Sequence, residues 1–155
     1  ESIYGRFKIK IENQVMRLPN GKFVIARLPM IFGINSPRTS EIDYAIQNDE
    51  AIEVFPNTII NVNSDIRLTQ QIHYLINQKK SGLYHLGSTD LISHFDFIKH
   101  AVERRHNKPG IYKQVFTSNT TRYLATLPKV NKLPSHILTS YLDVLDDLSL
   151  LSNRK

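Results

Sequence analysis

A tyrosine and a lysine stand four residues apart near the start of the printed sequence, in the stretch ESIYGRFK. If this stretch is helical, Tyr4 and Lys8 lie on one face, one turn apart. An ammonium group there favours the phenolate and lowers the pKa of the phenol from its ordinary value of about 10. The phenol can then act as a general acid or base near neutral pH, and the lysine can donate hydrogen bonds to the hydroxyls of a cofactor. Because the pattern also arises by chance, the alternative is an exposed helix face on which Lys8 pairs with Glu12.

The elements that position this pair are an amphipathic helix and a strand. An apolar stripe at every fourth position predicts a helix over residues 2–18, ended by a turn at Pro19-Asn20-Gly21. The apolar run over residues 23–28 is typical of a strand buried on both faces of a parallel sheet. Because an open edge on such a strand promotes aggregation, we expect it at an oligomer contact or paired with a strand of this chain, such as residues 82–87.

The rest of the sequence alternates between helical and β-prone segments. Helices are predicted over residues 38–49, with Thr39 or Ser40 as cap, and over residues 65–78 after the cap Asn63-Ser64-Asp65. Two more are predicted after Ser93, which forms a capping box with Asp96, and over residues 139–151. The inner face of the second helix is predicted to consist of Ile66, Leu68, Ile72, Leu75 and Ile76. Short strands are predicted at AIEVF, NTIINV, SGLYHLG and IYKQVF.

These segments together resemble one family. YGRFK, followed by the strand and loop ARLPMIFG and later by GLYHLGSTDLISHFDFIKHAV, resembles the C-terminal part of the extended short-chain dehydrogenase/reductase family, in its dTDP-4-dehydrorhamnose reductase branch. The likeness spans roughly residues 3–105. It implies an α/β fold, the C-terminal part of an NAD(P)-binding Rossmann-type reductase with its small mixed α/β substrate-binding lobe. Residues 1–35 would hold the catalytic helix and a late Rossmann strand, and residues 36–155 the substrate-binding lobe.

The resemblance also implies roles for individual residues. Tyr4 would be the general acid that protonates the sugar oxygen as hydride reaches its carbon, and Lys8 would hold the nicotinamide ribose and depress the pKa of Tyr4. Arg38 would meet the substrate phosphate, since the arginine fork suits phosphate. Four residues would lie beside the nicotinamide through their backbone: Leu28, Pro29, Met30 and Ile31.

Two parts of such an enzyme are missing from the sequence. There is no Gly-x-x-Gly-x-x-Gly turn to hold a pyrophosphate, and only three residues precede Tyr4, so the catalytic serine or threonine is absent. We therefore expect NAD or NADP to serve the complete enzyme, and we expect this chain alone to be inactive and to bind neither. A nucleotide sugar is the expected substrate. The alternatives are a non-catalytic sugar-nucleotide-binding or regulatory module and, third, a basic nucleic-acid-binding domain.

Composition sets limits on these alternatives. The 155 residues fit one domain, carry a net charge of +6 and include no cysteine, which suits a reducing, cytoplasmic compartment. No stretch approaches the roughly 18 apolar residues of a membrane span. The basic segment from Lys99 to Lys113 is interpreted as a solvated helix end, with an anion site or nucleic acid as alternatives.

Other groups of polar residues are given structural interpretations. His85 is interpreted as a satisfied core histidine, and the remaining histidines show no zinc-like spacing. Asp143, Asp146 and Asp147 are interpreted as solvated charges on an exposed helix face.

Overall fold

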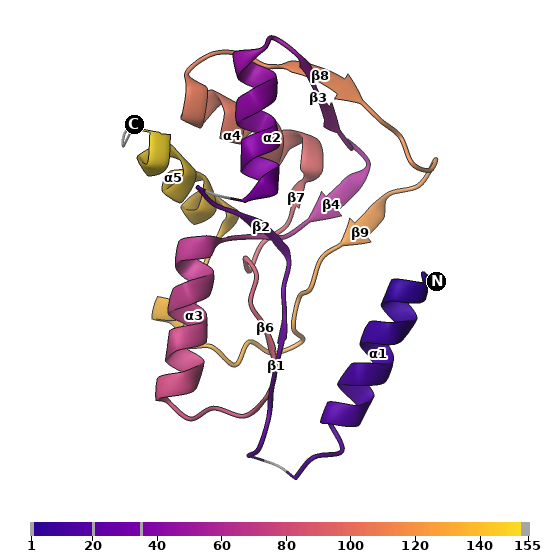
Figure 1. Cartoon of the computed structure of the whole chain (residues 1–155), viewed down its shortest axis with the longest axis vertical. Coiled ribbons are helices and arrows are strands. Elements are labelled where there is room, and N and C mark those ends of the chain that lie inside the picture. The colour runs from indigo at the N-terminus through magenta and orange to yellow at the C-terminus, as the bar shows by residue number, and fades with distance from the viewer. Residues whose placement is uncertain (1, 20, 35, 153–155) are drawn as a thin grey trace.

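The fold is mixed α/β, as the sequence predicts (Figure 1). A computed structural model describes residues 2–19, 21–34 and 36–152. Within these residues, short strands pair mostly in parallel, and α-helices lie around them. Asn20 of the predicted turn lies outside the described residues, and the Lys22 amide donates to the Pro19 carbonyl at 3.2 Å.

The lower part of Figure 1 is built around one pair of parallel strands. β1 (Val24–Arg27) pairs with β6 (Gly82–His85) in parallel, which confirms the pairing expected for the first strand. In this view α1 (Ile3–Val15) lies on one side of the pair and α3 (Asp65–Asn77) on the other. The carboxyl ends of β1 and β6 therefore lie at one edge, where parallel sheets of α/β proteins bind their ligands.

The prediction that β1 is buried on both faces is wrong for this chain. Val24, Ala26 and Arg27 are exposed, and only Ile25 is half-buried. The second edge of β1 pairs with no strand of the described residues. Nor does α1 seal the strand, because none of the residues of α1 is buried. The apolar character of this strand therefore reflects a surface that the described residues leave open.

The upper part of Figure 1 contains most of the other strands and helices. The parallel pairs are β2 (Met30–Phe32) with β5 (Val62–Ser64), and β3 (Ala51–Val54) with β8 (Ile111–Gln114). A three-stranded sheet has β4 (Thr58–Ile60) at its centre, antiparallel to β7 (Ile92–Ser93) and parallel to β9 (Arg122–Leu124). The helices are α2 (Pro37–Gln47), α4 (His94–His106) and α5 (Tyr141–Ser152), and a short 3₁₀ turn, η1 (Ser135–Ile137), precedes α5.

Capping serines set where these helices begin. Ser93 caps α4 as predicted, and within the predicted cap Asn63-Ser64-Asp65 it is Ser64 that caps α3; each hydroxyl accepts a backbone N–H of the first turn. The cap predicted for α2 is wrong: it is Ser36, whose Oγ accepts from the Thr39 amide at 3.2 Å. Pro37 explains the difference, because proline favours the first helical position and the cap must then precede it.

The predicted inner face of α3 is wrong in part. Leu75 is buried and Leu68 packs against the core, but Ile66, Ile72 and Ile76 are exposed. A buried glutamine takes their place: Gln71 Oε1 accepts from Asn63 Nδ2 at 2.8 Å. Because a buried amide must be hydrogen-bonded, these partners set which face of α3 turns inward.

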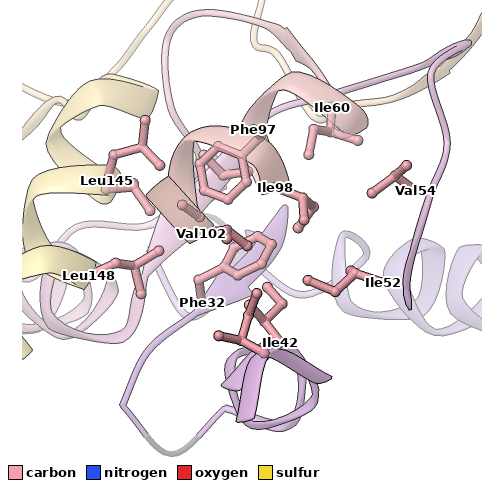
Figure 2. Packing of buried hydrophobic residues seen from close by; sticks show 14 of the residues in the cluster. Phe32, Ile42, Ile52, Val54, Ile60, Phe97, Ile98, Val102, Leu145 and Leu148 are labelled. Carbon is pink, nitrogen blue, oxygen red and sulfur yellow. The ribbon is translucent and has the colours of Figure 1, made fainter. Parts of the chain in front are cut away.

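One apolar core holds the upper part together (Figure 2). Phe32 of β2 meets Phe97 of α4 with ring centroids 4.7 Å apart, and Ile42 of α2 and Leu148 of α5 pack around them. A fully buried side chain of this size contributes roughly 1.5–3 kcal/mol. This packing fixes the positions of α2, β3 and the start of α4, the three elements that surround the main cavity.

Candidate functional site

Tyr4 and Lys8 lie on one face of α1, as their spacing predicts. Ser2 caps this helix by accepting from the Gly5 amide at 3.0 Å, so Tyr4 sits in the first turn. The Lys8 ammonium lies 5.4 Å from the centroid of the Tyr4 ring, within the range of a cation–π contact. Tyr4 is 70% exposed, and Lys8 is exposed as well. The pair is therefore accessible to a ligand, and its catalytic role stays a prediction.

Glu12 pairs with Arg27 and not with Lys8. Arg27 Nε donates to Glu12 Oε2 at 3.2 Å, and a second, very short contact joins Arg27 Nη2 to Oε1 of the same carboxylate. The hydrogen bond to Glu12 raises the pKa of the Arg27 guanidinium above its ordinary value. This contact ties α1 to the last residue of β1, immediately before the predicted cofactor-binding residues. Lys8 is thereby left without the acidic partner that the alternative interpretation assigned to it.

The predicted cofactor-binding residues connect β1 with β2. Leu28 is exposed, Pro29 is half-buried, and Met30 and Ile31 form the start of β2. Pro29 lies close to the carboxyl end of β6, where a Cβ on Gly87 would come within 3.1 Å of Pro29 Cγ and within 2.3 Å of Asn61 Nδ2. The glycine therefore permits the close approach of the two strand ends.

A cavity of about 800 Å³ lies between α2, β3 and the start of α4. Its floor is apolar and includes Phe32, Ile52 and Ile98, which point toward one another in Figure 2. Arg38, predicted to bind substrate phosphate, lines this cavity together with Met30. The polar and aromatic lining residues are Arg38, Ser40, Glu41, Tyr44, Glu50, Glu53, Phe55 and His94.

The predicted site residues thus fall into two groups. Arg38 and Met30 share the cavity, whereas Tyr4 and Lys8 do not line it. Among the described residues, α1 is joined to the rest of the chain by the side-chain contact of Glu12 with Arg27, and no hydrogen bond or ion pair joins Tyr4 or Lys8 to Arg38. In Figure 1, α1 stands beside β1, and α2 lies in the upper part.

His94 is a cavity residue that the sequence analysis missed. Its Nδ1 accepts a hydrogen bond from the Phe55 amide at 3.3 Å, and its ring meets the Phe55 ring edge-on at 5.1 Å. Burial, and then the positive charge of Arg38, hold the pKa of His94 below its ordinary value. The available signal was its place directly after the cap Ser93, which puts the side chain at the N-terminus of α4.

A second cavity of about 500 Å³ lies beside β6, under the loop of residues 127–133. Arg27, His85, Lys129 and Lys132 contribute to its lining. The interpretation of His85 as a satisfied core histidine is wrong, because His85 Nδ1 is buried and has no hydrogen-bond partner among the residues that the structure describes.

The basic segment from Lys99 to Lys113 is not simply a solvated helix end. Arg105 is buried and donates to both carboxylate oxygens of Asp43, each at 2.6 Å. Arg104 pairs with Asp146 of α5, and Lys108 Nζ donates to the Ile46 carbonyl at 2.8 Å. These contacts fix α4 against α2 and α5, so much of the positive charge of the segment serves packing.

The interpretation of the C-terminal carboxylates as solvated is wrong for Asp147. This residue is buried, accepts from Ser64 Oγ at 2.5 Å and pairs with Arg67 Nε at 2.8 Å. Asp143 accepts from the Ser140 amide at 2.7 Å, and this bond holds the pKa of Asp143 below its usual range. In residues 2–19, 21–34 and 36–152 no group of three or more histidine and acidic side chains is placed to hold a metal ion.

Comparisons with known proteins place the fold. No protein-family model and no curated protein matches the chain. A solved structure of dTDP-4-dehydrorhamnose reductase from Bacillus anthracis, in complex with NADP, matches 99% of the chain with a TM-score of 0.78 and 22% identity. The reductase from Clostridium acetobutylicum matches 97% of the chain with a TM-score of 0.73 and 17% identity. The chain has the fold of part of a dTDP-4-dehydrorhamnose reductase.

The likeness extends to other enzymes that act on nucleotide sugars. The ADP-L-glycero-D-manno-heptose-6-epimerase of Helicobacter pylori matches the whole chain with a TM-score of 0.70 and 13% identity. The chain spans about half the length of these proteins: 56% of each of the two reductases and 52% of the epimerase. The resemblance expected from YGRFK and ARLPMIFG is confirmed at the level of the fold. No helix within the described part of the chain is long and apolar enough to cross a membrane.

Proposed function

We propose that the chain is the substrate-binding part of an NAD(P)-dependent reductase that acts on a 4-keto nucleotide sugar. One observation carries the proposal: Arg38 and Met30, selected from the sequence as substrate-binding and cofactor-binding residues, line one cavity in a fold shared with an NADP-bound dTDP-4-dehydrorhamnose reductase. The volume of about 800 Å³ lies within the range of small-molecule sites.

The chemistry of the cavity lining suits a nucleotide sugar. The Arg38 fork can bind phosphate oxygens in bidentate geometry, and the apolar floor with the Phe55 ring can hold a flat base or a sugar face. Three carboxylates that would repel phosphate line the cavity, those of Glu41, Glu50 and Glu53, and Glu53 is paired with Lys113 Nζ at 2.8 Å. The division of the chain into a catalytic helix and strand over residues 1–35 and a substrate-binding lobe over residues 36–155 belongs to this proposal, as does a cytoplasmic location.

The residues of α1 would perform the acid–base step. The Tyr4 phenol would give its proton to the carbonyl oxygen of the sugar, which becomes a hydroxyl, and the Lys8 ammonium would stabilise the phenolate that remains. The nicotinamide cofactor, when bound, supplies the hydride that reaches the carbonyl carbon. The described residues fit only part of a dinucleotide site, namely the exposed Lys8 and the connection at Leu28 and Pro29.

The alternative of a non-catalytic sugar-nucleotide-binding module also has support. Arg38 lines the main cavity, whereas Tyr4 and Lys8 are not among its lining residues. One edge of β1 pairs with no strand of the described residues, and Ile3 and Phe7 of α1 are exposed, so this part of the chain offers a surface for self-association or for a partner polypeptide. Activity in a complete enzyme separates the two functions, while binding of the nucleotide sugar is common to both.

Calorimetric titration with dTDP-glucose tests the binding function. We expect binding by the chain and a loss of about tenfold or more in Arg38→Gln, because a charge-assisted hydrogen bond contributes roughly 1.5–3 kcal/mol. Arg17→Gln, which removes an exposed arginine outside the cavity, is the matched control and should bind as the unmodified chain does. Absence of binding at millimolar dTDP-glucose would refute the proposal, and micromolar binding of NADPH to the chain would refute the expectation that the cofactor site is incomplete.

A further inference from the structure

The backbone amide of Phe55, the residue directly after β3, selects the tautomer of His94. The Phe55 amide donates to His94 Nδ1 at 3.3 Å, so Nδ1 must carry a lone pair. A neutral imidazole has one protonated nitrogen, and when Nδ1 accepts, the proton lies on Nε2. The edge-on contact with the Phe55 ring, with centroids 5.1 Å apart, holds the plane of the imidazole.

The Nε2 atom of His94 is free to meet a ligand. Within the described part of the chain, Nε2 has no hydrogen-bond partner. The buried polar atoms without a partner are Asn57 Oδ1, His85 Nδ1, Tyr112 OH and Thr126 Oγ1. Because His94 Nε2 is not one of them, it is accessible from outside the protein interior. Since the residue lines the main cavity and its Nδ1 is engaged by the backbone, Nε2–H is a donor available to that cavity.

The surroundings of His94 favour a neutral acceptor over an anion. Burial and the nearby charge of Arg38 both disfavour the imidazolium by lowering the pKa of His94, so the ring is neutral at pH 7. The floor beside it is formed by Ile52 and Ile98, and Phe55 offers an aromatic face. Arg38 is exposed at the cavity and already supplies a permanent positive charge for phosphate.

We propose that His94 is a specificity residue that donates Nε2–H to a carbonyl oxygen of the pyrimidine base of the nucleotide sugar. This inference rests on the proposed function. It adds that the cavity recognises the base of the ligand, through the neutral ring of His94. A base that presents a carbonyl oxygen to Nε2–H satisfies the donor, whereas a base that presents an amino group there leaves two donors facing each other.

A cycle of two ligands and two variants tests the assignment. The ligands are dTDP, which has the base, and inorganic pyrophosphate, which lacks it. In His94→Asn, the side-chain oxygen can still accept from the Phe55 amide, but the donor at the Nε2 position is lost. We expect about a fivefold to tenfold loss of affinity for dTDP, which is the size of one neutral hydrogen bond. The affinity for pyrophosphate should not change. Arg38→Gln should weaken both ligands.

Each outcome of this cycle decides one question. If the unmodified chain does not bind dTDP, the proposed function fails, and the inference fails with it. If dTDP binds and His94→Asn weakens both ligands equally, or neither, the base contact is refuted while the proposed function stands. A two-bond ¹H–¹⁵N spectrum of the unmodified chain needs no variant: it should show His94 as the Nε2–H tautomer, with the Nε2 resonance shifted by dTDP and not by pyrophosphate. An Nδ1–H tautomer, or equal shifts with both ligands, would overturn the inference.

Discussion

Replacing Asp43 by asparagine should strongly destabilise the chain. The Asp43 carboxylate accepts from Arg105 Nε and Nη2 at 2.6 Å each and contacts His106 Nε2 at 2.9 Å. The Arg105 side chain is only 4% exposed, and that of Asp43 15%. Arg105 Nη1 also donates to the Leu148 carbonyl at 3.2 Å, so one guanidinium joins α4 to α2 and α5.

The size of the effect follows from the charge that remains. Asp43→Asn leaves the Arg105 guanidinium buried without a countercharge, and breaking a buried pair in this way costs about 3–5 kcal/mol. Because the Asp43 side chain keeps some contact with water and asparagine can still accept one hydrogen bond, we expect the lower end, about 3 kcal/mol. For a chain of this length, that corresponds to a melting temperature lower by roughly 6–12 °C.

Urea unfolding followed by far-ultraviolet circular dichroism at pH 7 measures this change. The unfolding midpoint of Asp43→Asn should fall while the dependence on urea stays the same, since the surface exposed on unfolding does not change. Glu53→Gln is the matched control, because it removes a carboxylate whose pair with Lys113 is exposed, and its midpoint should equal that of the unmodified chain. A loss below about 1 kcal/mol in Asp43→Asn would refute the claim that this buried pair holds the helices together.

Three further predictions concern the helix cap, pH and catalysis. Ser36→Ala should lower the free energy of unfolding by about 1 kcal/mol in urea titrations, because Ser36 caps α2. Ser40→Ala, the control, should change the free energy of unfolding little. Equal effects of the two substitutions would contradict the assignment of the cap. Burial lowers the pKa of His94 and of His106, so their contribution to stability is complete above about pH 6.5 and declines as the pH falls below it. Burial raises the pKa of Asp43, but the hydrogen bonds and charges of Arg105 and His106 together outweigh it and lower this pKa, so a second loss of stability should follow below about pH 4. This second loss should be smaller in Asp43→Asn. Urea midpoints that do not change between pH 7.5 and pH 3 would contradict both the histidine and the Asp43 predictions. In a complete enzyme, Tyr4→Phe should abolish turnover and leave cofactor binding nearly intact, and substantial residual turnover in a steady-state assay would remove Tyr4 from the acid–base role.

Local signals in the sequence predicted much of the fold. Ser93 was identified as a cap, and the cap of α3 was placed within Asn63-Ser64-Asp65, because capping residues are recognised from their immediate neighbours. The pairing of β1 with β6 followed from two apolar runs and the need of the first for a partner. The spacing of Tyr4 and Lys8 likewise gave their common face, because one turn of helix fixes it.

Contacts between distant segments were not predictable in the same way. Asp147 is 83 residues from Ser64, and Arg105 is 62 residues from Asp43, so nothing near either residue in the sequence reveals that it is buried. The same holds for His94, whose partner Phe55 lies 39 residues away. Helix periodicity also failed for α3, where the inward-facing Gln71 is buried and donates to the Ile137 carbonyl, 66 residues away, while Ile66, Ile72 and Ile76 are exposed.

Mapping the dTDP-glucose site on the isotopically labelled chain by NMR tests directly whether the main cavity binds a nucleotide sugar. We expect the amide resonances of Arg38, Phe55 and His94 to shift with one common dissociation constant, because these residues line the cavity between α2, β3 and α4. Shifts confined to the second cavity, around His85 and Lys129, would contradict this placement. Unchanged spectra at millimolar dTDP-glucose would contradict nucleotide-sugar binding by the chain altogether.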